Sequence, residues 1–139
     1  MERYLIQSKN EMKAAVKEAF RLGMALASLH VCEVMIVCPT RSQAGSPDVR
    51  VAIGEKASAS LIKSKKTTLQ GINVSLETYE SLKKINQELE GVVVCLWLSE
   101  SFARKIENFT ACCKALVVVE CFDSLNEWLE INKAELIQV

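Results

Sequence analysis

The sequence lacks the glycine-rich motifs by which proteins most often hold phosphate groups. Its five glycines are scattered along the 139 residues, at Gly23, Gly45, Gly54, Gly71 and Gly91. They form neither a G-x-x-x-x-G-K-S/T loop nor a G-x-G-x-x-G turn after a strand. A dinucleotide or nucleoside triphosphate site of the familiar kind is therefore not predicted.

The sequence also lacks a net charge and a long apolar run. Its 17 acidic and 17 basic residues balance, which argues against a nucleic-acid binder that works by neutralising phosphates. No segment has the roughly 18–20 consecutive apolar residues of a membrane span. The first residues carry charges on both sides of a four-residue apolar stretch, unlike a signal peptide. We expect a cytoplasmic protein that binds neither membranes nor nucleic acids.

Histidine is nearly absent, and no C-x-x-C pair occurs among the six cysteines. The only histidine, His30, precedes an apolar run, whereas Cys121 follows another, so a Cys–His catalytic pair is geometrically poor. A metal site made of His30, Cys32, Cys112 and Cys113 matches no structural zinc spacing. We therefore predict no catalytic residue, no metal and no cofactor, and we expect reduced thiols.

Three short apolar runs dominate what is present. They are Val31–Cys38, Gly91–Leu98 and Lys114–Val119, and each is followed by an amphipathic stretch. Runs of this length that are rich in β-branched residues suit strands buried on both faces, and alternation with helices implies parallel pairing. The sequence predicts a single three-layer (Rossmann-like) α/β domain over residues 1–139. We expect a mainly parallel sheet of about 4–5 strands with helices on both faces.

The remaining elements follow from periodicity and capping patterns. Capping boxes at Ser8-x-x-Glu11 and Ser124-x-x-Glu127 predict the starts of the first and last helices. Between Pro47 and Ser64 a helix is predicted, although Val49–Ile53 also alternates like a strand. One further helix is predicted to carry Tyr79, Leu82, Ile85 and Leu89, and another to carry Phe102, Ile106 and Phe109. Two weak strands are predicted at Ile72–Ser75 and Leu136–Val139.

Ligands of open parallel sheets bind beyond the carboxyl ends of the strands. This rule selects three loops, whose candidate ligand-binding residues are Thr40, Arg41, Ser42, Ser46, Ser99, Glu100, Ser101, Glu120 and Asp123. The first loop has a cation, hydroxyls and a following helix start, so a small anionic ligand is one candidate. The acids could form a functional cluster, but capping and the helix dipole also explain acids at these positions.

Two functions stay open on this sequence. The first is a non-catalytic binding or interaction module, and the second is a small enzyme or a nucleotide- or anion-binding protein that uses the three loops. The 50% apolar composition favours a homodimer, since two-fold dimers are the commonest soluble assembly. Trp128, Leu136 and Val139 are the interface candidates, whereas Trp97 is expected in the core.

Overall fold

The computed structural model describes residues 1–84 and 89–139. Within these residues a seven-stranded sheet has the order β3-β4-β2-β5-β6-β1-β7. Its strands are β1 (Glu2–Gln7), β2 (Val34–Cys38), β3 (Lys66–Leu69), β4 (Ile72–Thr78), β5 (Val92–Leu96), β6 (Ala115–Val119) and β7 (Glu135–Gln138). All neighbours pair in parallel except β3, which is antiparallel to β4.

The three apolar runs form the centre of the sheet, as predicted. They are β2, β5 and β6, which lie side by side and pair in parallel. Every residue of β5 and β6 is buried, because helices cover both faces. The first run enters the sheet only at Val34, since Val31 ends the preceding helix with a left-handed φ of 52° and is 91% exposed.

The expected number of strands was wrong, because the sheet has seven strands rather than four or five. The segments not predicted are β1 and β3. In β1 only Leu5 and Ile6 are fully buried. The strand therefore lacks the continuous apolar run by which the central strands were predicted, although β6 and β7 flank it. The polar strand β3 lies at one edge of the sheet, and the predicted edge strand at the carboxyl terminus is β7.

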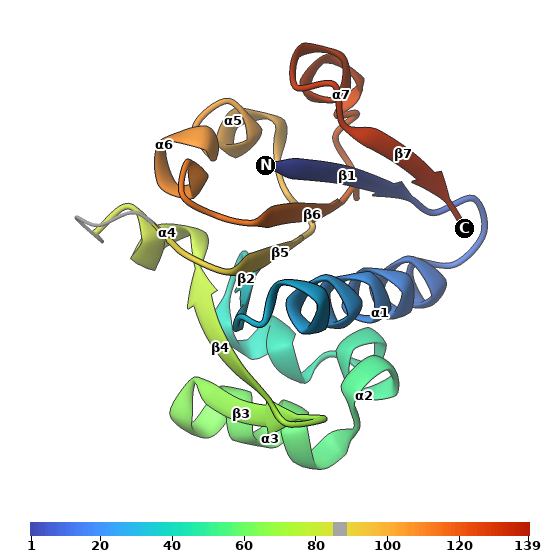
Figure 1. Cartoon of the computed structure of the whole chain (residues 1–139). Coiled ribbons are helices and arrows are strands. Elements are labelled where there is room, and N and C mark those ends of the chain that lie inside the picture. The colour runs from blue at the N-terminus through green and yellow to red at the C-terminus, as the bar shows by residue number, and fades with distance from the viewer. Residues whose placement is uncertain (85–88) are drawn as a thin grey trace.

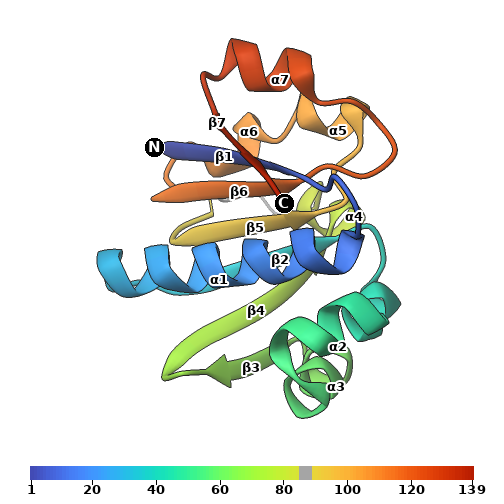
Figure 2. The same cartoon turned by 90° about the vertical axis from the view of Figure 1, so that its right-hand side faces the viewer.

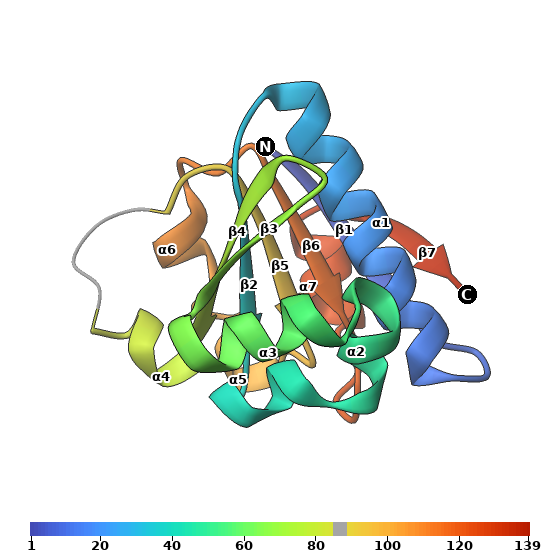
Figure 3. The same cartoon turned by 90° about the horizontal axis from the view of Figure 1, so that it is seen from below.

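Helices cover both faces of the sheet (Figures 1 and 2). One face carries α1 (Met12–His30), the 3₁₀ helix η1 (Arg41–Gly45), α2 (Pro47–Ile53) and α3 (Glu55–Ser64). The other carries α4 (Tyr79–Leu82), α5 (Glu100–Ala103), α6 (Glu107–Thr110) and α7 (Asn126–Ile131). Figure 3 shows α3 in front of the β3–β4 hairpin. The three-layer arrangement is thus confirmed.

Several helix bounds differ from those expected. The predicted helix from Pro47 to Ser64 is two helices, because Gly54 takes a φ of 91° between them; the segment Val49–Ile53 is helical and not a strand. The segment with Phe102 and Phe109 also forms two short helices, α5 and α6. Of the residues expected in the helix that carries Tyr79 and Leu82, Ile85 lies outside the described residues and Leu89 is not helical.

The helix caps in the structure differ from the two capping boxes expected. Ser99 caps α5, with its Oγ accepting a hydrogen bond from the backbone N–H of Phe102 at 3.2 Å. The two capping boxes were wrong, because Glu11 and Leu125 occupy the N-cap positions of α1 and α7 without a side-chain cap. Ser8 and Ser124 therefore lie one or more residues outside the helices that they were expected to start.

Gly91 provides a prediction about stability. It has a φ of 81°, and a Cβ atom built on it would lie 2.5 Å from the backbone oxygen of Glu33. Gly71 has a similar φ of 78°, but a Cβ atom there would meet nothing within 4 Å. Both Gly→Ala variants suffer the backbone penalty, and only Gly91→Ala must also move the backbone of Glu33, the residue before β2.

We expect Gly91→Ala to lower the free energy of unfolding by about 1–3 kcal/mol more than Gly71→Ala, the range for overpacking. Urea unfolding of the two variants, followed by circular dichroism, measures this difference. Equal losses would show that the contact with Glu33 is relieved without cost.

Candidate functional site

The three predicted loops meet at one crevice. The chain leaves β2 toward α2 and α3 on one face of the sheet, and it leaves β5 toward α5 on the other. Adjacent strands whose connections diverge in this way leave room beyond their carboxyl ends. A cavity of about 700 Å³ lies there. This carboxyl-edge crevice is lined by Met12, Pro39, Gln43, Asp48, Trp97, Leu98, Ser99, Cys121, Phe122 and Asp123.

In the first loop, the expected anion-binding groups make internal contacts instead. The Arg41 guanidinium donates to the backbone oxygens of Ile62 and Lys63, at the carboxyl end of α3. Thr40 forms a capping box with Gln43 at the start of η1, and its Oγ1 lies 3.2 Å from the Oγ of Ser42. Arg41 therefore stabilises the end of a helix, where a cation suits the dipole, and does not line the crevice.

Ser46 precedes α2 as expected, but its side chain makes no cap hydrogen bond. In the described part of the chain its Oγ atom is buried without a hydrogen-bond partner. Because α2 has only seven residues, its first turn is a weak place for an anion. The first loop thus supplies hydroxyls near the crevice but no positive charge to it.

The predicted acids also make hydrogen bonds or ion pairs within the protein. Asp123 accepts a hydrogen bond from the N–H of Glu100 at 2.8 Å, so its carboxylate occupies the start of α5. Glu120 accepts from the N–H of Leu125 at 3.0 Å and from the side chain of Gln7 at 3.1 Å. Glu100 pairs with Arg104, and the Ser101 Oγ lies 3.2 Å from that of Ser99. The three acids therefore serve three separate contacts.

The aromatic lining of the crevice was missed by sequence reasoning. Trp97 is half-buried with a φ of 59°, a left-handed conformation that is strained for a bulky residue. Phe122 is 100% exposed. Trp97 and Phe122 each follow a buried strand by one or a few residues. An aromatic residue beside the polar residues of a strand-end loop could therefore have indicated this lining from the sequence. Asp48 and Asp123 are the charged residues of the described lining.

The thiol at the crevice, Cys121, lies far from the single histidine of the sequence, His30. Burial raises the pKa of the Cys121 thiol, the nearby Asp123 carboxylate raises it further, and only the N–H of Phe122 lowers it. His30 lies at the opposite, amino edge of the sheet, where its Nε2 is 3.4 Å from the Glu2 carboxylate. Cys121 therefore stays protonated near neutral pH, and His30 does not face it.

The amino edge of the sheet brings together another set of side chains. His30, Cys32 and Cys112 line a hollow there with Glu33 and Glu90. Within residues 1–84 and 89–139, no group of three or more His, Cys, Asp or Glu residues is arranged to hold a metal ion. The proximity of these residues thus does not amount to a metal centre in the described structure.

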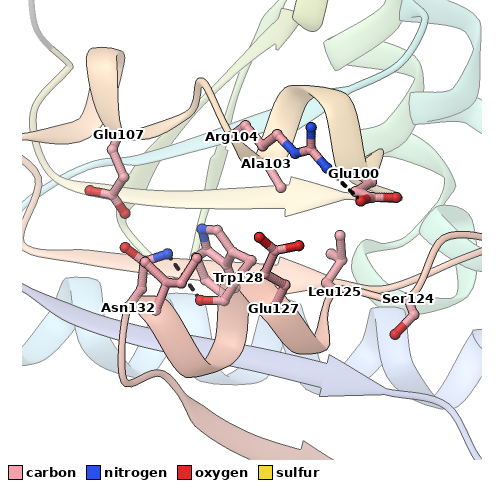
Figure 4. Close-up of a pocket in the computed structure, with 10 residues that line it drawn as sticks. Glu100, Ala103, Arg104, Glu107, Ser124, Leu125, Glu127, Trp128 and Asn132 are labelled. Carbon is pink, nitrogen blue, oxygen red and sulfur yellow. Dashed lines mark hydrogen bonds and ion pairs between the residues drawn. The ribbon is translucent and has the colours of Figure 1, made fainter.

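A second cavity, of about 280 Å³, lies between α5, α6 and α7 (Figure 4). Its apolar floor includes Ala103, Leu125 and Trp128, and charged residues surround it. Trp128 is 6% exposed, and in the described residues its indole Nε1 has no hydrogen-bond partner. A buried donor without an acceptor costs about 1–3 kcal/mol. We call this cavity the α5–α7 groove.

The interface candidates occupy different environments. Trp128 is 6% exposed and packs in the buried cluster of its own chain, and its place at an interface stays a prediction. Leu136 is 43% exposed on β7, the edge strand. Val139 is half-buried, and its backbone bonds to Gln7 and Lys9 extend the pairing of β7 with β1. The homodimer stays a prediction, with Leu136 at the open edge of the sheet.

Comparison of the chain with protein-family models, with curated proteins and with solved structures finds no match. Among the helices of the described residues, none has both the length and the apolar character required to cross a membrane.

Proposed function

We propose that this protein is a non-catalytic binding module whose carboxyl-edge crevice receives an apolar or aromatic group bearing a neutral or positive polar end. The observation that carries the proposal is the complete exposure of Phe122 at the crevice, next to the strained Trp97. Exposed aromatic side chains and strained backbone at a cavity are typical of binding sites. A partner that covers Phe122 would remove this apolar surface from water.

The charge of the crevice supports the same class of ligand. Asp48 and Asp123 lie in its lining, and the described lining residues include no lysine, arginine or histidine. A carboxylate repels a phosphate, whereas a cation is attracted both to carboxylates and to the faces of aromatic rings. The second candidate function, binding of a nucleotide or another anion, loses its expected cation because Arg41 bonds to the backbone at the end of α3.

The separation of the crevice thiol from the histidine favours binding over catalysis at the crevice. A nucleophile needs a base within hydrogen-bond reach, yet His30 and Cys121 lie at opposite edges of the sheet. The carboxylates of Glu120 and Asp123 accept backbone hydrogen bonds within the protein, so their oxygen atoms are already in contact with the chain itself.

Two small probes test the class of ligand. We expect tyramine, a cationic aromatic amine, to shift the NMR signals of the Trp97 indole and of the amides at 97–99 and 121–123. Adenosine monophosphate, an anionic aromatic compound, should bind there more weakly. Phe122→Ala should weaken tyramine binding by about two- to fivefold, the contribution of an exposed cation–π contact.

Leu29→Ala is the matched control, because Leu29 is also exposed but lies at the amino edge. It should leave tyramine binding unchanged. Tighter binding of adenosine monophosphate than of tyramine at these residues would instead favour the anion-binding function. Tyramine binding that is insensitive to Phe122→Ala would contradict the proposed site.

A further inference from the structure

The α5–α7 groove has the chemistry of a second, separate binding site. We infer that it holds a basic segment of another protein, with one large aliphatic side chain on the groove floor. In this arrangement a backbone carbonyl of the segment accepts a hydrogen bond from Trp128, and a lysine or arginine of the segment pairs with Glu127. The inference does not depend on the carboxyl-edge crevice.

The first observation is the unused donor of Trp128. The side chain is more than nine-tenths buried, and in the described residues its Nε1 atom has no acceptor. Figure 4 shows the nitrogen end of the indole pointing from α7 toward the α5–α6 segment, across the groove. Buried polar groups are almost always paired, so the donor marks a place for an acceptor. The carbonyl of an extended peptide is an acceptor of this kind.

The second observation is the charge around the groove. Glu100 pairs with Arg104 at 2.9 Å, and Glu107 pairs with Arg3 at 2.8 Å. Glu127 also lines the groove, and it has no ion pair in the part of the chain that the structure describes. The groove therefore carries one uncompensated negative charge, which a basic side chain complements.

The third observation is the size and polarity of the cavity. Its volume of about 280 Å³ lies just below the roughly 300–1,000 Å³ of pockets that enclose whole small molecules. The floor formed by Ala103, Leu125 and Trp128 is apolar, and Ile131 beside it is 70% exposed. A cavity of this kind suits a single anchoring side chain, as in peptide recognition by grooves.

Two capped dipeptides test the inference. The probes are acetyl-Leu-Lys-amide and acetyl-Leu-Glu-amide, and the readout is the NMR signal of the Trp128 indole N–H. Trp97→Phe identifies this signal, since the chain has two tryptophans. We expect the lysine dipeptide to shift the Trp128 signal in proportion to occupancy. It should bind about two- to fivefold more tightly than the glutamate dipeptide, as an exposed ion pair allows.

The matched variants are Glu127→Gln and Glu130→Gln, which change neighbouring exposed acids of the same helix. Only Glu127→Gln should abolish the preference for lysine, because Glu130 does not line the groove. A Trp128 signal that stays unmoved in the folded protein at saturating lysine dipeptide overturns the inference. Equal binding of the two dipeptides overturns it as well. Failure of the crevice proposal would appear at Trp97 and Phe122 instead, so the two proposals are tested independently.

Discussion

Trp128→Ala is expected to lower the free energy of unfolding by about 3–5 kcal/mol, the range for truncating a buried tryptophan or phenylalanine. The indole is 6% exposed and belongs to the buried cluster that joins α7 to the sheet, together with Phe102, Leu116 and Leu125. Truncation would leave a cavity between α7 and these residues. The loss is reduced slightly because the orphaned indole N–H disappears with the ring.

Ile131→Ala provides the control for this prediction. Ile131 belongs to the same helix but is 70% exposed, so its truncation should cost less than about 1 kcal/mol. Urea unfolding followed by circular dichroism compares the two variants. If Trp128→Ala were no more destabilising than Ile131→Ala, the indole would not contribute to the core of the chain.

The stability of the protein is expected to fall steeply at alkaline pH. Burial raises the pKa of the Cys38 thiol from 9.0 to about 12. Burial likewise raises the pKa of Cys95, and the pKa of Tyr79 rises because of burial and the neighbouring thiols. When the pH exceeds the pKa that each group has in the unfolded chain, the folded state therefore still holds a proton that the unfolded state has lost. The free energy of unfolding then decreases as the pH rises toward the higher pKa that the group has in the folded state.

The expected loss is large because three groups act in the same direction. Each contributes up to about 1.4 kcal/mol per pH unit, which amounts to roughly 5 kcal/mol in total between about pH 9 and pH 11. Urea unfolding at a series of pH values measures the slope. In the Cys38→Ala variant the slope should fall by about a third, whatever the variant's stability at neutral pH. A free energy of unfolding that is constant over this interval would contradict the burial of these groups.

The predictability of each strand followed from how many of its residues are buried. Residues of β5 and β6 are buried on both faces, and β-branched residues fill these strands, so the pattern in the sequence was strong. In β1 two fully buried residues, Leu5 and Ile6, sit among charged and polar neighbours. Its place between β6 and β7 depends on segments more than 100 residues away, so no local pattern indicated it.

The sequence predicted which edge of the sheet carries the loops, but not the contacts that their side chains make. The rule that ligands lie beyond the carboxyl ends of parallel strands located the crevice. The roles of Arg41 and Asp123 depended on partners distant in sequence, because Arg41 reaches the end of α3 and Asp123 reaches the start of α5. Residue type alone indicated charge at these loops and could not indicate that the charged groups hydrogen-bond to distant parts of the protein's own backbone.

By itself the sequence determined the α/β class, the three parallel central strands and the edge that carries the loops, because burial on both faces leaves a local pattern of apolar residues. Only the tertiary structure decided that Phe122 is exposed and that, among residues 1–84 and 89–139, Trp128 is buried without an acceptor and Glu127 has no ion pair. Exposure, hydrogen-bond pairing and charge pairing depend on which segments the fold brings together, and these segments are far apart in the chain.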